Sequence, residues 1–500
     1  MTKAPARDVT PAGAALEPTG EAETGDRRVG LVVVATAAAY AVVVGALSLL
    51  RYESFASDFD HGIFAQYVWL LGHLDEPFNT VNLRTLLGDH VEPGIAVLAP
   101  LGTLGIGAPG ILVVQALALA ATAPLLYLLA REHGARGWLA AAPALLWCAS
   151  PVVLRPGLHD FHPETLVPVL LVGGCLALAR DRVVWFAATA VLACAMKEDV
   201  GLAYAALGLV LLWSGRRRLG ALVAIAAAAW SLVAVYVVLP AFGNAAEKEF
   251  GPRFAGERGD SVSDVVRYSV LHPLSAVDRA LTPQDVGVLA MLVLTTGGLC
   301  LLAPRWLLVA VPGAALNLLS AYDLQHTIAY HYWVVPAGAV AVAGAVGASR
   351  VGAADSRTWL RIGAATGAFL LVLSLQWGSA IVEQIRFEWP RRDDRQAVLD
   401  RIPANARVAA PMQALAHLAE REHLYVVPEP LVPVRVGTEW TAADRERATA
   451  ELDYIVFDPR LKLWGAPTAD EVEQEIVRRG FVEVYAREGI RLFGRPGSDG

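Results

Sequence analysis

The chain has 500 residues, of which 55% are hydrophobic, and its formal net charge is -7. Soluble domains are about 45–50% apolar, and the excess here is concentrated in long apolar runs between Val29 and Val382. These runs exclude an ordinary soluble globular protein, because a bilayer core of about 30 Å requires about 20 apolar residues per helix. Only short Arg clusters occur, so no basic face indicates a nucleic-acid partner.

The chain begins with a polar segment, and apolar runs follow. Residues 1–28 are rich in Ala, Pro, Gly, Thr and Glu, which predicts a disordered tail. A transmembrane domain of about eleven helices is expected over residues 29–390, with the first helix over Val29–Leu50. The other ten are expected over Ile111–Ala130, Trp138–Leu154, Leu166–Ala179, Val183–Met196, Val200–Trp213, Leu219–Leu239, Val286–Ala303, Trp306–Ser320, Trp333–Ala348 and Leu360–Val382.

The arginines predict the orientation in the membrane. Cytoplasmic loops carry an excess of Lys and Arg. With the N-terminus inside, the short inner gaps hold Arg131, Arg136, Arg180, Arg182, Arg216, Arg217, Arg218, Arg305, Arg350, Arg357 and Arg361. The short outer gaps hold only Arg155 and Lys197. We therefore expect a multi-pass plasma-membrane protein with a cytoplasmic N-terminus. The Arg- and Ala-rich, Lys-poor composition is typical of a GC-rich bacterium.

Two long outer loops are expected, over residues 51–109 and 241–285. In the first loop, apolar residues recur at helical spacing, which predicts an amphipathic helix lying on the membrane surface. These residues are Phe59, Ile63, Phe64, Tyr67, Val68 and Leu71. The stretch Gly94–Leu104 is apolar but too short to cross the membrane twice, so we expect an interfacial or re-entrant segment.

Residues 391–500 differ in pattern and predict a small extracytoplasmic α/β domain. Strands are expected over Arg407–Ala410, Tyr425–Val427 and Tyr454–Phe457, and a hairpin over Phe481–Arg487 and Ile490–Gly494 turns at Glu488-Gly489. Amphipathic helices are expected over Gln413–Glu422 and Asp470–Arg479. The fold class is therefore an all-α polytopic membrane protein with a small C-terminal α/β domain.

Titratable residues gather on the expected outer side, first in the segment Ser57–Gln66. Asp58 and Asp60 flank Phe59 directly after the first span. One interpretation is a general base at a dry interface, where a desolvated carboxylate is a better base near neutrality. The alternative is a helix N-cap, since Asp is common in that position. We expect Asp60 to be the base, and Asp58 is the second candidate catalytic residue.

Three further motifs and one cluster lie at expected outer span ends. His90 lies in Gly88–Pro93, which could also be a solvated turn. His162 and Glu164 belong to His159–Glu164, where a divalent metal remains an alternative to hydrogen bonding with a substrate. In the third motif Lys197 could bind a phosphate that Asp199 orients, or it could form a local ion pair. The cluster contains His326, Tyr330, His331 and Tyr332.

In their joint order, these motifs resemble a family of predicted bacterial membrane proteins, domain of unknown function 2079. The resemblance covers about Leu31–Arg495 and rests on Phe59–Gln66, His90 with Pro93, His162–Glu164, Lys197–Asp199 and Tyr330–Tyr332. That family is similar in layout to the C superfamily of integral-membrane glycosyltransferases. The resemblance implies a polyprenyl-phosphate sugar donor and an acid in the first outer loop. Mannosyltransferase members have adjacent Asp-Glu, whereas here Phe59 separates the two acids.

Together with the motifs, this resemblance implies inverting transfer of a sugar from a polyprenyl-phosphate donor to an outer-leaflet or envelope acceptor, which is a glycan, lipid or protein. Asp60 is the expected base. The expected phosphate contacts are Lys197, His326, His331 and Arg155, and the other expected substrate contacts are Gln66, His90, His162, Glu164, Asp199 and Tyr330. No cofactor is firmly predicted. The rivals are a transporter or flippase, and a non-catalytic scaffold that presents the C-terminal domain; the sequence shows no inverted repeat of the kind common in transporters.

Overall fold

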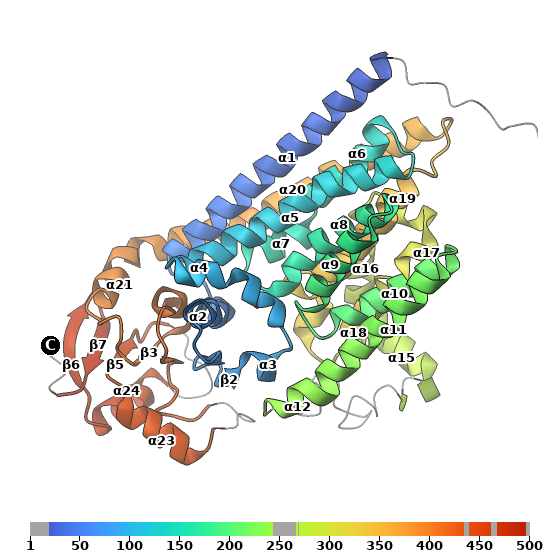
Figure 1. Cartoon of the computed structure of the whole chain (residues 1–500). Helices are drawn as coiled ribbons and strands as arrows, with labels where there is room; N and C mark the ends of the chain where they lie inside the picture. Colours follow the sequence, from blue (N-terminus) through green and yellow to red (C-terminus); the bar gives the residue numbers. More distant parts are fainter. Residues whose placement is uncertain (1–19, 244–266, 269, 435–439, 462–467, 497–500) are drawn as a thin grey trace, which may run out of the picture.

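The computed structural model describes residues 20–243, 267–268, 270–434, 440–461 and 468–496. Long helices run side by side, and the C-terminal sheet lies at one end of the bundle beside α2 (Figure 1). The first half contains α1 Gly20–Glu53, α2 Phe59–His73, β1 Phe78–Asn79, β2 Arg84–Thr85, α3 Leu86–Asp89, η1 Pro93–Leu98, α4 Ala99–Thr103, α5 Gly107–Glu132, α6 Gly137–Ala149, α7 Pro151–Leu158, η2 Pro163–Leu166, α8 Val167–Ala179, α9 Val183–Cys194, α10 Val200–Trp213, α11 Arg217–Val233, η3 Ala234–Val238 and α12 Leu239–Ala241.

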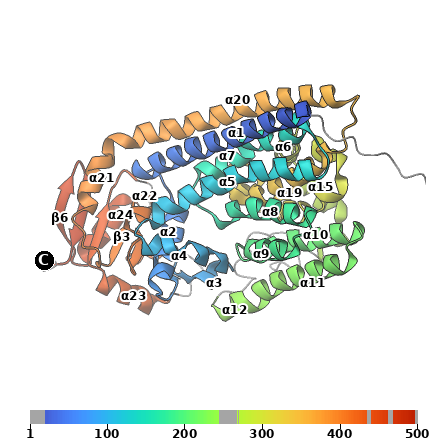
Figure 2. The same cartoon turned by 45° about the horizontal axis from the view of Figure 1, so that its top comes forward.

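The second half continues the bundle and then forms the sheet. Its helices are α15 Pro273–Ala280, α16 Pro283–Leu294, η4 Leu299–Leu302, α17 Pro304–Leu307, α18 Val311–Leu319, η5 Asp323–His326, η6 His331–Trp333, α19 Val334–Ala348, α20 Ser356–Glu388, η7 Trp389–Arg391, α21 Arg392–Leu399, α22 Met412–Leu415, η8 Ala416–Leu418, α23 Ala442–Glu451 and α24 Ala469–Arg478. In a view turned by 45°, α20 and α1 lie along one side of the bundle (Figure 2).

All eleven predicted apolar runs contain helix, but a count of eleven spans is not confirmed. Among the described residues, five helices are long and apolar enough to cross a membrane, or six if α6 and α7, bent by 43°, form one span. Other runs give short helices such as α9, with 12 residues, and α10, with 14. At 1.5 Å per residue these reach about 20 Å, which is less than the bilayer core.

The predictions for the N-terminal tail and for the expected outer loops can be compared with the structure only in part. The disordered tail is wrong over residues 20–28, because these residues form the start of α1; the first 19 residues lie outside the described part. Much of the expected second loop, residues 244–266 and 269, also lies outside it. Gly94–Leu104 forms two short helical segments, η1 and α4.

The central helix α19 is buried, and it positions His331, one of the candidate substrate contacts. His331 begins η6, which leads directly into α19. All its side chains except Val335 are buried, and they are Val, Ala, Gly and Pro. A Cβ added at Gly347 would lie 1.9 Å from the Leu299 carbonyl oxygen. Such small residues let helices approach closely where apolar surroundings supply little driving force for association.

The helix α2 forms as predicted, but the solvated face expected of a surface helix is not observed. Nine of its residues, from His61 to Leu70, are buried. Gly62 approaches α22 so closely that an added Cβ would lie 2.5 Å from Cβ of Leu415. The polar side chain of Gln66 donates hydrogen bonds to the carbonyl oxygens of Arg421 and Glu422, at 3.0 and 3.1 Å. The C-terminal region therefore covers the face that periodicity assigned to solvent.

The C-terminal sheet has five strands in the order β4-β3-β5-β7-β6. β3 (Val408–Ala410) pairs in parallel with β4 (Leu424–Val426) and β5 (Tyr454–Phe457). β7 (Ile490–Gly494) joins β5 to β6 (Val482–Arg487) by antiparallel pairing. The hairpin turn has positive φ at both Glu488 and Gly489, as a tight two-residue turn requires. The five strands occur where predicted, whereas helical structure over Gln413–Glu422 is limited to α22 and η8.

Candidate active site

The site begins where α2 starts, because the first turn of this helix carries Asp60. Its Oδ2 lies 3.3 Å from Nε2 of His162, which follows α7. The Asp60 side chain is 44% exposed, so the expected dry environment around this carboxylate is wrong. Asp58 is the N-cap of α2, and its carboxylate accepts a hydrogen bond from the Phe59 amide at 2.9 Å. The capping alternative therefore holds for Asp58.

A buried carboxylate that the sequence analysis did not select organises this region. Asp160 accepts hydrogen bonds from the backbone amides of Asp58, at 3.0 Å, and His61, at 3.3 Å. Arg51, from the end of α1, forms a 2.6 Å ion pair with the same carboxylate. Burial alone would raise the pKa of Asp160, but Arg51 and nearby histidines outweigh it and hold this pKa below its ordinary value. The ionised Asp160 thus fixes the α2 N-terminus beside His162.

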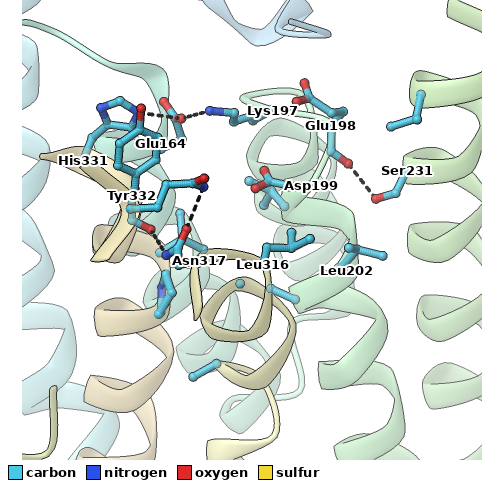
Figure 3. Close-up of a pocket in the computed structure, with 18 of the residues that line it drawn as sticks. Glu164, Lys197, Glu198, Asp199, Leu202, Ser231, Leu316, Asn317, His331 and Tyr332 are labelled. Carbon is cyan, nitrogen blue, oxygen red and sulfur yellow. Dashed lines mark hydrogen bonds and ion pairs between the residues drawn. The ribbon is translucent and has the colours of Figure 1, made fainter. Parts of the chain in front are cut away.

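From His162 the polar cluster continues across three elements. The ring of His331 stacks on His162 with centroids 3.5 Å apart, and its Nε2 lies 3.5 Å from Oε1 of Glu164. Glu164 also pairs with the ammonium of Lys197, and Figure 3 shows these side chains facing one another. Burial alone would lower the pKa of Lys197, but Glu164, Asp199 and Glu198 raise it above its ordinary value, so the ammonium stays charged.

This chain of contacts links Asp60 to Lys197 through His162, His331 and Glu164. They are separated by up to 271 positions in sequence (331 − 60), and the helix bundle brings them together.

The Lys197 end opens into a cavity of about 210 Å³ between α10, α11, α18 and α19. Its polar end is formed by Glu164, Lys197, Glu198, Asp199, Asn317, Gln325 and His331. The rest is mostly apolar and includes Val200, Leu202, Ala203, Leu232, Val235, Val309, Leu316 and Val335. Within the described part of the chain, Oε2 of Glu164 and Nδ1 of His331 are buried without a hydrogen-bond partner. Because such groups are costly unless satisfied, they point to a polar ligand.

His90 and Asp199 both lie close enough to Lys197 to interact with its charge. Nδ1 of His90 contacts Oε1 of Glu198 at 2.9 Å. Burial alone would lower the pKa of His90, but Glu198 outweighs it and raises this pKa to about 9. Burial raises the pKa of Asp199 to about 6, against the attraction of Lys197. His90 is therefore cationic at neutral pH and compensates Glu198.

Three other residues that were expected to contact the substrate lie outside this chain of contacts. Both ring nitrogens of His326 are engaged, one by Asp285 at 2.6 Å and one by the Ser320 carbonyl at 2.9 Å. The guanidinium of Arg155 stacks over the ring of Trp377, 3.0 Å from its centroid. Tyr330 lies edge-on to His159, with ring centroids 5.3 Å apart.

Gln66 belongs to a junction rather than to this cluster. Its amide is buried and bonded to Thr80 and the C-terminal segment. His326 and Gln66 thus have structural partners that the sequence pattern did not reveal, among them Asp285 for His326 and Arg421 for Gln66. Asn317 and Gln325, which line the cavity, were not selected because a single amide has no distinctive spacing.

A divalent metal was the alternative for the His159–Glu164 motif. No group of three or more His, Cys, Asp or Glu side chains is arranged to hold a metal within the described ranges. The acids there are engaged by cations of the protein: Asp160 by Arg51, and Glu164 by Lys197. The donor set as arranged does not fit a metal, and no chemical step is assigned to one.

Comparison with family models identifies the chain. The model described as "Predicted membrane protein (DUF2079)" matches residues 51–479. The chain belongs to this family. The matched region contains every residue of the site from Asp60 to His331, as well as Arg51 and Asp160. No curated protein matches the sequence.

Solved structures identify the fold of this DUF2079 protein. ArnT from Cupriavidus metallidurans bound to undecaprenyl phosphate aligns with a TM-score of 0.51 and 12% identity, over 91% of this chain and 98% of that chain. The apo state of ArnT gives a TM-score of 0.52 and 11% identity, over 92% and 99%. This likeness shows the fold alone, and the fold agrees with the layout that the sequence resemblance implied.

Proposed function

We propose that this DUF2079 protein transfers a sugar from a polyprenyl-phosphate donor to an acceptor at the outer leaflet of a bacterial plasma membrane. The observation that carries the proposal is the continuous path of side chains from Asp60 through His162 and His331 to Glu164 and Lys197. One end of this path is accessible to water, and the other lies at the polar end of an apolar cavity. ArnT, with the same fold, was solved bound to undecaprenyl phosphate.

The cavity suits a lipid phosphate because one end is polar and the rest is mostly apolar. The apolar walls from α10, α11, α18 and α19 can cover the first isoprene units, since burial of apolar area is favourable. An ammonium has three N–H donors, and Lys197 has one contact with Glu164 among the described residues. Its remaining donors can bind the phosphate oxygens and stabilise the charge that develops on the leaving group.

In this arrangement Asp60 is the general base. It removes the proton from the acceptor hydroxyl, whose oxygen attacks the anomeric carbon of the sugar. The bond to phosphate breaks, its electron pair leaves with the lipid phosphate, and Lys197 stabilises that product. Attack opposite the leaving group inverts the anomeric configuration. The exposed edge of Asp60 gives the acceptor and the released proton a route to water.

Arg155 is a second candidate for contact with the anionic donor. Among the described residues it has no ion pair with a carboxylate, and Trp377 supports its guanidinium. Tyr330 lies close enough to interact electrostatically with the guanidinium of Arg155, and Tyr330 contacts His159, which lies beside His162. We therefore assign Arg155 to the sugar–phosphate end of the donor rather than to its lipid chain.

The proposal is tested by comparing envelope glycans and glycolipids in a deletion strain and in strains complemented with single variants. Wild type and Asp75→Asn should restore a sugar modification that the deletion lacks, because Asp75 is exposed at the other end of α2. Asp60→Asn should reach the membrane at normal levels without restoring it. Restoration by Asp60→Asn would contradict the proposal.

A further inference from the structure

We propose that His162 is a doubly protonated positioning residue for Asp60, and that the loss of one ring proton disables the base. This inference deepens the proposed function and rests on it, since Asp60 is the base there. His162 was expected only to contact substrate. Its neighbours indicate that it acts through the carboxylate instead.

The hydrogen-bond partners of the ring determine its protonation. Nδ1 lies 3.1 Å from the backbone carbonyl oxygen of Asp160. A carbonyl oxygen only accepts hydrogen bonds, so Nδ1 carries a proton. Nε2 lies 3.3 Å from Oδ2 of Asp60. An ionised carboxylate also only accepts, so contact with the active form of the base requires a second proton on Nε2.

The surrounding charges agree with this assignment. Burial alone would lower the pKa of His162, but the hydrogen bond and charge of Asp60, together with Glu164, raise it above its ordinary value. His159 lies 6.4 Å away between ring centroids, and burial lowers its pKa to about 4, so it is neutral near pH 7. The ring of His331 stacks on the ring of His162, and its Nε2 lies 3.5 Å from Oε1 of Glu164.

Asp160 contributes to the alignment from both sides. Its side chain holds the first turn of α2, and its carbonyl oxygen holds Nδ1 of His162. The positions of Asp60 and His162 thus depend on the same residue. Asp60 is therefore held in position by its contact with His162, although almost half of its side-chain surface is open to solvent.

His162 keeps both of its ring protons throughout the transfer reaction. Nε2–H holds Oδ2 of Asp60, so Oδ1 accepts the proton from the acceptor hydroxyl. His162 neither gains nor loses a proton during transfer. At higher pH, a neutral His162 that keeps the proton on Nδ1 would present a lone pair to the carboxylate. Repulsion would then release Asp60 toward water, and a base displaced by about 1 Å loses up to about 10²-fold in rate.

The pH profile of purified protein in lipid nanodiscs tests this role. In wild type we expect kcat to decrease at alkaline pH. The midpoint of this decrease should lie above about pH 6.5, the ordinary pKa of histidine. His162→Gln can donate to Asp60 at any pH, so it should keep measurable activity and lose this alkaline limb. His162→Ala should lower kcat by up to about 10²-fold. An alkaline limb that is unchanged in His162→Gln would overturn the inference.

A second measurement does not depend on turnover. In protein with ¹⁵N-labelled histidine, NMR difference spectra between wild type and His162→Gln assign the His162 ring nitrogens. Two protonated nitrogens at pH 7 are expected in wild type, and one is expected in Asp60→Asn. A singly protonated ring in wild type would refute the inference even if the enzyme is active. If the expected spectra are obtained from a protein that transfers no sugar, the proposed function is contradicted, whereas the pairing of His162 with Asp60 is supported.

Discussion

Arg51 and Asp160 form a buried ion pair, 2.6 Å between Nη1 and Oδ1, that joins the end of the first long helix to the segment before α8. The same carboxylate binds two backbone amides of the first turn of α2. The residue that positions the proposed base is therefore neither in its helix nor near it in sequence.

Loss of Arg51 should destabilise the protein strongly. Removing one partner of a buried pair leaves an uncompensated charge, which typically costs about 3–5 kcal/mol. We expect Arg51→Met to lower the thermal unfolding temperature in detergent clearly. Arg180→Met is the control, because Arg180 pairs with Glu132 at the surface, where such pairs are worth about 0–1 kcal/mol. Equal effects of the two variants would contradict a structural role for the buried pair.

Asp58 should affect stability rather than chemistry. As the N-cap of α2, its replacement by Ala should cost about 1 kcal/mol. We expect a small decrease in unfolding temperature and nearly normal kcat at a temperature where the protein is folded. A loss of kcat that equals the loss in Asp60→Asn, with normal stability, would transfer the role of base to Asp58.

Part of this site follows from local sequence, and part does not. The motifs around Asp60, His162 and Lys197 stand out because charged residues interrupt apolar runs at their ends. The buried state of α2 does not follow, because its covering residues, such as Leu415, are more than 300 positions away. The same distance hides the bonds of Gln66 to Arg421 and Glu422.

The fold shows the same division. Periodicity and turn residues locate all eleven apolar runs and the strands β3 to β7, because these depend on neighbours within a few positions. Whether a run of 12–14 residues crosses the membrane depends on the helices that cover it. The number of spans therefore remains a tertiary property that hydrophobicity alone does not determine.

Lys197 should contribute to binding of the donor phosphate as well as to stabilisation of the leaving group. The variant Lys197→Met would leave Glu164 as a buried charge, so we expect it to be destabilised. The double variant Lys197→Met/Glu164→Gln removes both charges and should remain folded. Its KM for the lipid donor should rise roughly 10- to 100-fold, the value of a hydrogen bond to a charged group. An unchanged KM in the folded double variant would exclude Lys197 as a phosphate contact.

The pair of His90 and Glu198 should make stability depend on pH. Glu198 raises the pKa of His90 above that of the unfolded chain, about 6.5. The stabilisation is therefore complete below about pH 6.5 and is lost as the pH rises through about 9. Unfolding temperature measured between pH 6 and 10 should decrease over this window. The decrease should be smaller in His90→Gln, and an identical decrease would exclude His90 as its source.

Orientation in the membrane can be tested by cysteine labelling of intact cells. The native cysteines are first replaced by Ala. An impermeant thiol reagent should modify Ser498→Cys, in the proposed outer region, and spare Ser214→Cys, which lies in the exposed turn between α10 and α11. Labelling of Ser214→Cys with Ser498→Cys protected would invert the topology and place the site on the cytoplasmic side.

The most direct measurement of the proposed chemistry is release of polyprenyl phosphate by purified protein in nanodiscs. The nanodiscs would contain a ³²P-labelled polyprenyl-phosphate sugar pool from the native membrane together with its extracted envelope acceptors. We predict that wild type releases labelled polyprenyl phosphate as sugar is transferred, and that Asp60→Asn is slower by about 10²–10⁴-fold, the usual contribution of a general base. Release at the same rate by wild type and Asp60→Asn, or no release by folded wild type, would contradict sugar transfer at this site.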